Sequence, residues 1–372
     1  SGPAGGMVLS TPASPHGAGG IKPLALWVLP VSNLAGVARH TLDALGAGIP
    51  DWRVVALAPS GPLVAELEKI GVAVVADAFG PEAGLVTSIR TLRRVCDRLH
   101  PAIVHTHLAY ADIVAALTPL SGAMRISTEH GIAAADQIYQ GSHHKAQIMR
   151  RIHQARLHRA DALIAVCQST AATMRRNWRT QAPITVILNG VDPPVERNSR
   201  PPTFDPHILS LSRLAPEKRI DALLQAFAVL VREHPGARLT IAGEGELDQP
   251  LRELVARLGI ADKVSLSGFV DAAEALTACD VVVQLSVWEN CSYTLLDAVA
   301  AGVGVVASPA GGNPEILPAQ CLVDPADPAD VARAILTQAC DAGARPAQLR
   351  HEWPSTAAMA RAIAAVYECA TP

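Results

Sequence analysis

Residues 281–307, VVVQLSVWENCSYTLLDAVAAGVGVVA, hold the pattern that decides the fold. An apolar run at 281–285 is followed by a loop, by a segment of helical periodicity at about 293–301, and by a second apolar run at 303–307. Short apolar runs that alternate with helical segments are typical of parallel strands joined by crossover helices. The stretch therefore predicts a strand-helix-strand unit of an α/β protein.

The same alternation extends over most of the chain and falls into two series. Strands are expected at 24–29, 54–58, 72–76, 103–106, 126–128, 163–166 and 185–188, and in a second series at 208–212, 239–242, 264–266, 281–285 and 303–307. Between the series, the turn Asn189-Gly190-Val191-Asp192-Pro193-Pro194 leads into a polar, Pro-rich stretch that ends at Pro206. Such a stretch is typical of a linker between two domains.

Four segments are expected on this basis. Residues 1–20, rich in Gly, Pro, Ala and Ser, are expected to be a disordered leader or tag remnant. Two Rossmann-like domains are expected at 21–194 and 195–352, and a helix at 353–372 could pack back on the N-terminal domain. Two such domains in tandem place a crevice between the carboxyl ends of their strands, where open α/β sheets bind ligands.

Composition narrows the classes of function. A formal net charge of -3 gives the 372-residue chain no general attraction to nucleic acid. Its 7 cysteines are scattered along the sequence, which indicates a reducing, cytoplasmic location and no bound metal. The apolar runs are far shorter than the roughly 20 residues that a membrane-spanning helix needs.

Glu289 lies in the loop between an expected strand and an expected helix. The first backbone N–H groups of a helix carry partial positive charge and suit a phosphate, while a nearby carboxylate suits sugar hydroxyls. These properties describe a site for a sugar nucleotide. The alternative is that Glu289 is an acid favoured by the helix dipole and Asp297 an ordinary exposed helical acid.

The stretch from Glu289 to Asp297 resembles the Glu-x7-Glu signature of family 4 glycosyltransferases, which have two Rossmann-like domains in the GT-B arrangement. The resemblance implies that Glu289 contacts hydroxyls of the donor sugar and that Asp297 binds the nucleotide ribose. Two departures stand out, because Asp replaces the second Glu and the usual Gly-rich start is absent. The rest of the donor loop comprises Asn290, Cys291, Ser292, Tyr293 and Thr294.

Further motifs of the same family occur in the same order along the chain. The run Ser212-Arg213-Leu214-Ala215-Pro216-Glu217-Lys218 is similar to its Gly-Arg-Leu-x-x-Glu-Lys-Gly element, so Arg213 and Lys218 would stabilise the leaving diphosphate without a metal. The run Asn33 to His40 resembles its Gly-rich loop beneath the donor phosphates, with Gly36 as the remaining glycine. The run 310–315 is similar to its Gly-Gly-x-Pro-Glu loop, which we interpret first as a tight turn.

Histidines follow two neighbouring strands and resemble the family's Asp-x-Val-His-x-His and Thr-x-His-Gly runs. We expect His107 to lie against the donor sugar and His130 to line the cleft or position an acceptor. Side chains alternate along a strand, so His105 is expected to be structural.

The segment 143–159 combines apolar residues with five basic ones, Lys145, Arg150, Arg151, Arg156 and Arg159. We favour a solvated basic face on a helix that packs against the first domain. The alternative is peripheral contact with the inner face of a membrane or with a lipid-linked acceptor.

The resemblance implies a retaining, metal-independent hexosyltransferase that moves a sugar from a donor such as a UDP- or GDP-sugar to an acceptor hydroxyl. Biosynthesis of a bacterial glycan, glycolipid or glycosylated natural product is the expected setting, and no cofactor is needed. A non-catalytic GT-B protein that binds sugar nucleotides or docks a partner is the alternative. A nicotinamide-dependent dehydrogenase is disfavoured because no G-x-G-x-x-G turn follows the first strand.

Overall fold

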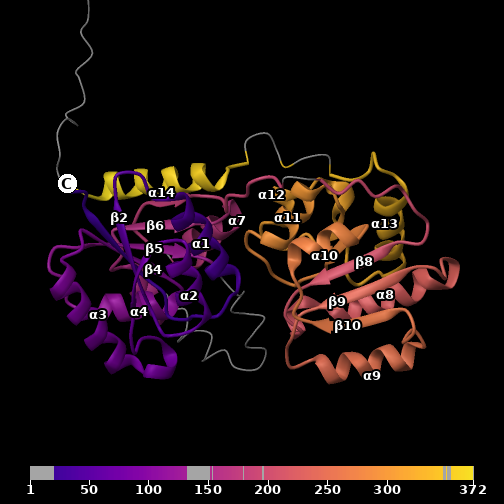
Figure 1. Cartoon of the computed structure of the whole chain (residues 1–372), viewed down its shortest axis with the longest axis horizontal. Coiled ribbons are helices and arrows are strands. Elements are labelled where there is room, and N and C mark those ends of the chain that lie inside the picture. The colour runs from indigo at the N-terminus through magenta and orange to yellow at the C-terminus, as the bar shows by residue number, and fades with distance from the viewer. Residues whose placement is uncertain are drawn as a thin grey trace, which may run out of the picture.

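The computed structural model describes residues 21–131, 151–152, 154–178, 180–194, 197–346, 349 and 353–371. These residues form two parallel sheets flanked by helices (Figure 1). The predicted α/β class is confirmed, and each expected strand is present within about two residues of its expected position. The expected leader and residues 143–150 of the basic segment lie outside the described residues.

The first sheet has the strand order β3-β2-β1-β4-β5-β6-β7, with all neighbours parallel. Its strands are β1 (Leu24–Val28), β2 (Arg53–Ala58), β3 (Ala73–Ala76), β4 (Ile103–His107), β5 (Met124–Glu129), β6 (Ala162–Ala165) and β7 (Ile184–Val186). Its helices include α1 (Gly36–Ala47), α2 (Pro62–Lys69), α3 (Leu85–Leu99), α4 (Ala109–Leu117) and α7 (Gln168–Thr173). The strand order reverses between β1 and β4.

The second sheet has the order β10-β9-β8-β11-β12, again parallel throughout. Its strands are β8 (His207–Leu211), β9 (Arg238–Ala242), β10 (Val264–Gly268), β11 (Val281–Gln284) and β12 (Gly304–Ala307). Its helices are α8 (Ile220–Glu233), α9 (Asp248–Leu258), α10 (Ala272–Ala278), α11 (Tyr293–Ala301), α12 (Asn313–Ile316) and α13 (Pro328–Cys340). Here the order reverses between β8 and β11.

Local sequence explains the unit that decides the fold. Strands β11 and β12 are buried along their whole length, as continuous apolar runs in a covered parallel sheet should be. The Ser292 side chain accepts a hydrogen bond from the Leu295 N–H and so caps the start of α11. Gly302 ends the helix at φ 78°, a conformation that glycine adopts without steric cost.

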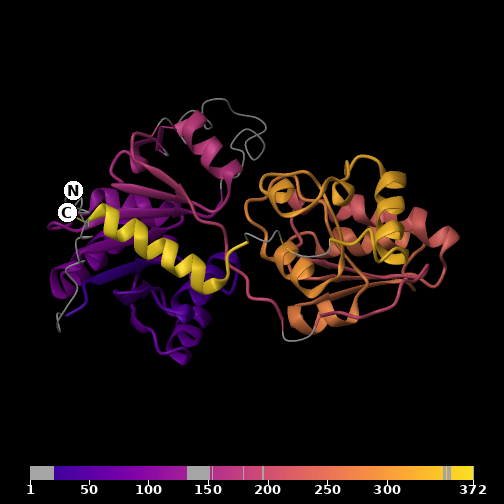
Figure 2. The ribbon, with the colours of Figure 1, turned by 90° about the horizontal axis from the view of Figure 1, so that it is seen from above.

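The last helix, α14 (Thr356–Ala370), packs on the first sheet although the residues before it belong to the second (Figures 1 and 2). Tyr367 is fully buried there, and its hydroxyl accepts a hydrogen bond from the Trp27 indole N–H at 2.8 Å. We call the first sheet with its helices and α14 the first unit, and the second sheet with its helices the second unit. We retain 21–194, 195–352 and 353–372 as proposed domain boundaries, since each sheet lies within one range.

The described helices include none that is both long enough and apolar enough to cross a membrane.

Candidate functional site

The predicted motifs follow the strands at which the two sheets reverse order. Gly36 comes after β1, His107 ends β4, Lys218 comes after β8 and Glu289 after β11. In open α/β sheets the ligand-binding crevice lies outside the carboxyl ends of the strands at this point of reversal. The topology therefore assigns all four positions to the binding edge of their sheets.

The post-strand loops of the two units contact each other at these edges. The Thr170 hydroxyl donates to Asn290 Oδ1 at 2.8 Å, and Asn189 Nδ2 donates to the Cys291 carbonyl at 2.9 Å. The Glu315 carboxylate accepts hydrogen bonds from the backbone N–H groups of Gln168 and Ser169 at 3.0 and 2.9 Å. Residues 289–292 and 310–315 are thus held against the first unit.

Glu289 forms an ion pair with Lys218 at the edge of the second sheet. Both side chains are largely buried, with 11% and 15% of their surface exposed. The two loops are aligned by a backbone hydrogen bond of 2.8 Å from the Val287 N–H to the Glu217 carbonyl. A carboxylate and an ammonium group therefore lie side by side at the start of the loop that leads into α11.

The loop at 310–315 packs directly on this donor loop. A Cβ atom added to Gly311, which has φ 52°, would lie 1.6 Å from the Glu289 carbonyl oxygen, and one added to Gly312 would lie 2.2 Å from that of Asn290. Both distances are impossible for a real side chain. The tight turn predicted here therefore also supports the backbone of the donor loop.

Arg213 and Gly36 have fewer close neighbours than Lys218 and Glu289. The Arg213 side chain is 68% exposed and pairs with Glu217 at 2.6 Å. Gly36 begins α1, and a Cβ atom added there would meet no atom within 4 Å in the described part of the chain. Lys218 and Glu289 are brought together by the fold, whereas the Arg213 side chain lies at the surface in an ion pair with Glu217.

Asp297 is paired across the two units. Its carboxylate accepts hydrogen bonds from Arg39 at 3.1 and 3.3 Å, and Arg39 also bonds Asp43 at 2.7 Å. The Arg39 guanidinium lies 5.0 Å above the ring of Tyr293. Burial raises the pKa of the Asp297 carboxyl, and Arg39 opposes that rise. The expected ribose-binding acid thus already has a cationic partner, Arg39, which sequence reasoning missed.

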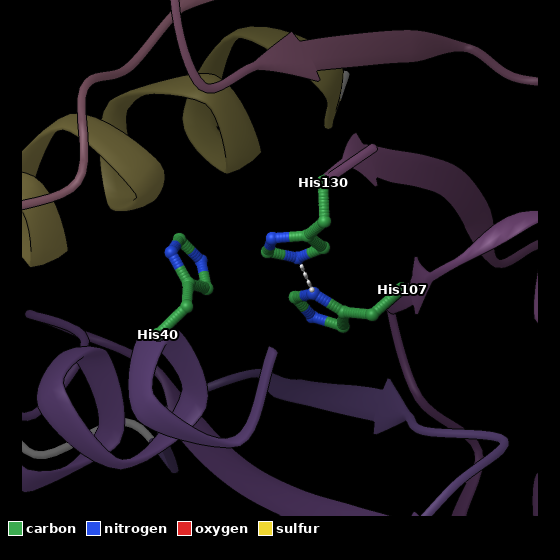
Figure 3. A group of neighbouring side chains, drawn as sticks. All are labelled: His40, His107 and His130. Carbon is green, nitrogen blue, oxygen red and sulfur yellow. Dashed lines mark hydrogen bonds between the residues drawn. The ribbon is translucent and has the colours of Figure 1, made fainter. Parts of the chain in front are cut away.

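Three imidazoles meet at the edge of the first sheet (Figure 3). His107 is fully buried, and its Nδ1 lies 2.9 Å from Nε2 of His130, which is half-buried. His40, from α1, packs edge-on against His130 with ring centroids 4.6 Å apart. Burial lowers the pKa of His40 to about 4 and lowers the pKa values of His107 and His130 well below the usual range. The histidine cluster, His40, His107 and His130, is therefore neutral near pH 7.

His105 occupies the structural position expected for it. Its Nδ1 lies 2.6 Å from the Tyr367 hydroxyl and its Nε2 lies 2.7 Å from the Thr128 hydroxyl, in the core beneath α14. His40 was not predicted as a site residue. One signal was available, because His40 lies four residues after Gly36 and so shares its helical face.

The cluster also offers ligand atoms for a transition metal, since one nitrogen of each ring lies within 4.8 Å of the others. Zinc binds histidine nitrogen at about 2.0–2.1 Å, so tetrahedral ligands lie about 3.4 Å apart. Two of the nitrogens, His107 Nδ1 and His130 Nε2, are only 2.9 Å apart and already share a hydrogen bond. We therefore interpret the group as a hydrogen-bonded cluster.

The strand that ends just before His130, β5, is anchored by a buried ion network. Arg156 is 3% exposed and bonds both Asp112 and Glu129, the last residue of β5. Burial raises the pKa of the Glu129 carboxyl, and Arg156 opposes that rise. The solvated basic face that we favoured for 143–159 therefore does not include Arg156, which points inward, although Arg151 and Arg159 are exposed.

Comparisons with known proteins agree with the motifs. The model for Glycosyltransferase Family 4 matches residues 34–194, and the model for Glycosyl transferases group 1 matches 205–341. A phosphatidylinositol N-acetylglucosaminyltransferase component from Arabidopsis thaliana is 27% identical over 68% of this chain. Glycogen synthase of Mycobacterium tuberculosis is 28% identical over 77% of this chain and 77% of its own length. The chain spans 57% of the Arabidopsis protein and 29% of an archaeal glycosyltransferase, MJ1607 of Methanocaldococcus jannaschii.

Solved structures share the fold over nearly the whole chain. The structure of HepE from Anabaena with UDP and glucose has a TM-score of 0.74 at 19% sequence identity, and covers 94% of this chain and 97% of that one. A glycosyltransferase from Rickettsia africae has a TM-score of 0.71 at 19% identity, with 94% and 98% coverage. Together with the two family models, this likeness shows that the chain belongs to the family 4 glycosyltransferases and has the GT-B fold.

Proposed function

We propose that this chain is a retaining, metal-independent glycosyltransferase that moves a hexosyl group from a nucleoside-diphosphate sugar to an acceptor hydroxyl. One observation carries the proposal, the Lys218–Glu289 ion pair at the start of the loop leading into α11. The ammonium group matches a phosphate, the carboxylate matches sugar hydroxyls, and the first N–H groups of the helix add positive potential beside them. These groups together match both the phosphate and the sugar of a sugar nucleotide.

Donor binding would divide the ion pair between two parts of the ligand. Lys218 would turn to the diphosphate, joined by Arg213, and Glu289 would accept hydrogen bonds from the sugar. The structure of HepE contains UDP and glucose, and the Mycobacterium relative is a glycogen synthase, which supports a nucleoside-diphosphate hexose as the donor. Asp297 would bind the ribose in place of, or together with, its present partner Arg39.

In the reaction, the acceptor oxygen forms a bond to the anomeric carbon as the bond from that carbon to the diphosphate oxygen breaks. The acceptor attacks from the face that the diphosphate leaves, so the anomeric configuration is retained. The departing phosphate oxygen takes the acceptor proton, and the products are the glycoside and a nucleoside diphosphate. Lys218 and Arg213 would stabilise the charge on the leaving group. His130, half-buried and neutral, would face the sugar or the acceptor as a hydrogen-bonding group, and the fully buried His107 would hold His130 from behind rather than contact the sugar directly.

Thermal shift with UDP, GDP, ADP and dTDP, each with and without its sugar, identifies the donor first, because a bound ligand raises the unfolding temperature. With the best donor, Glu289→Ala should lower the transfer rate by a factor on the order of a hundred or more, while the protein still folds. Glu253→Ala is the matched control, since Glu253 is an exposed acid on α9 whose side chain accepts only from Gln249 among the described contacts. Equal turnover by the two variants, or an inverted anomeric product, would refute the proposal.

A further inference from the structure

The Asn189 side chain joins the donor loop to the histidine cluster. Its Nδ2 donates to the Cys291 carbonyl at 2.9 Å, and its Oδ1 lies 3.0 Å from His40 Nδ1. Asn189 is 4% exposed and His40 is 1% exposed, so both contacts are shielded from water. A single amide therefore bridges the second unit's loop and the first unit's imidazoles.

The two contacts fix the direction of each hydrogen bond. Only the NH2 end of an amide can donate to a carbonyl, so the Oδ1 end of Asn189 must accept from His40. His40 therefore carries its proton on Nδ1. Since burial keeps the ring neutral, Nε2 of His40 holds a lone pair, and this atom has no hydrogen-bond partner among the described residues.

That lone pair is presented to the His107–His130 pair. The three rings form a triangle, with centroids 4.6 Å apart for His40 and His130, 5.2 Å for His107 and His130, and 5.9 Å for His40 and His107. One nitrogen of His130 is bonded to His107 and the other lies on the side of His40 (Figure 3). No hydrogen bond joins His40 to His130 among the described residues, but at this ring-contact distance the lone pair favours, through its negative potential, an N–H on the near side of His130. That tautomer leaves Nε2 of His130 to accept from Nδ1 of His107.

We propose that Asn189 and His40 are positioning residues that couple the seating of the donor loop to the tautomer and orientation of the His107–His130 pair. The inference rests on the proposed function, in which His130, held by His107, faces the reacting sugar or the acceptor. When the Cys291 carbonyl is in place, the Asn189 amide is oriented, His40 holds its proton on Nδ1, and the pair is aligned. When the loop moves away, the amide is free to turn, and the pair loses that alignment.

The test combines imidazole NMR with kinetics on the full chain. In uniformly 15N-labelled protein without substrate, His40 should show the Nδ1–H tautomer. Asn189→Ala should shift it toward Nε2–H and change the 15N signals of His107 and His130. The same variant should lower kcat by about tenfold to a hundredfold. Its affinity for the nucleoside diphosphate, measured by calorimetry, should change less than twofold.

Two further variants separate positioning from general damage. Thr170→Val breaks another hydrogen bond to the same loop, that to Asn290 at 2.8 Å, and should leave the imidazole signals of the cluster as in wild type. His40→Asn keeps an N–H directed at Asn189 and removes the Nε2 lone pair, so it should reproduce the change in the pair and in kcat. It also carries the test if Asn189→Ala does not fold.

Wild-type 15N signals for His107 and His130 in Asn189→Ala, or a normal kcat in His40→Asn, would overturn the inference. The tautomer measurement needs no substrate. If the wild-type chain neither binds a nucleoside diphosphate nor transfers a sugar, the proposed function fails by itself, and the NMR arm still decides whether the coupling exists.

Discussion

The two sides of the proposed site are built from opposite chemistry. On the second unit, Lys218 and Glu289 are charged and pair with each other, and Arg213 is 68% exposed. On the first unit, the histidine cluster is held neutral by burial. We call these two groups of residues the charged side and the neutral side. A diphosphate that leaves with its bonding electrons needs fixed positive charge, whereas a hydroxyl that attacks an electron-poor carbon needs neutral hydrogen-bonding groups. Under the proposed function, the second unit would therefore hold the leaving group and the first unit the reacting centre.

Near the histidine cluster, Arg156 forms a buried ion network with Asp112 and Glu129. Arg156→Met should have the largest effect on stability, because it leaves both carboxylates buried without their cation. Loss of one partner from a buried ion network typically costs about 3–5 kcal/mol. Urea unfolding should show a loss of that size.

Arg159→Met is the matched control, since Arg159 lies three residues further on and is exposed. Its free energy of unfolding should stay within about 0.5 kcal/mol of wild type. If the two variants were equally stable, Arg156 would not be the anchor of β5.

On the charged side, Lys218→Met should weaken binding of the nucleoside diphosphate by roughly a hundredfold, as expected for loss of a charge-assisted phosphate contact that also leaves Glu289 unpaired. Arg213→Ala should cost less, because its side chain begins largely in water. Lys263→Met is the control, since Lys263 directly precedes β10 and so lies at the opposite edge of the sheet. Unchanged calorimetric affinity in Lys218→Met would remove this residue from the donor site.

Lower pH should destabilise the folded protein through the buried histidines of the neutral side. In the unfolded chain these histidines take up protons near pH 6.5, whereas burial lowers the pKa of His40 to about 4 in the folded protein. As the pH falls from 6.5 toward 4, the unfolded state binds protons that the folded state does not, so stability is lost. The loss is at most about 1.4 kcal/mol per pH unit for each such histidine. Urea unfolding across this range should show a shallower decline in His40→Asn, and an identical decline would place the lost stability elsewhere.

The sequence predicts the charged side better than the neutral one. The strands, the bounds of α11 and the contact of Lys218 with Glu289 depend on short apolar runs and on two loops that follow neighbouring strands. Such loops must meet at one edge of a parallel sheet. Their proximity therefore follows from topology alone.

The contacts that escaped prediction join distant parts of the chain through single side chains. Arg39 and Asp297 are 258 residues apart in sequence, and His40 and Asn189 are 149 apart. Neither pair follows from periodicity, because each depends on how the two units dock and on the direction of one amide. The sequence analysis allows a last helix that packs back on the first unit, but the helical pattern does not specify that Tyr367 is the residue buried there.

Metal removal should have the smallest effect on the transfer rate, and its outcome tests both the charged side and the neutral side. If Lys218, Arg213 and the N–H groups at the start of α11 neutralise the diphosphate, EDTA should leave the transfer rate within about twofold of the untreated value. Added Mg²⁺ or Mn²⁺ should not raise it. Loss of transfer that Mg²⁺ or Mn²⁺ restores would mean that these cations do not suffice. Loss that only Zn²⁺ restores would instead point to the histidine cluster, where the hydrogen bond between His107 and His130 would have to break for both rings to bind the ion.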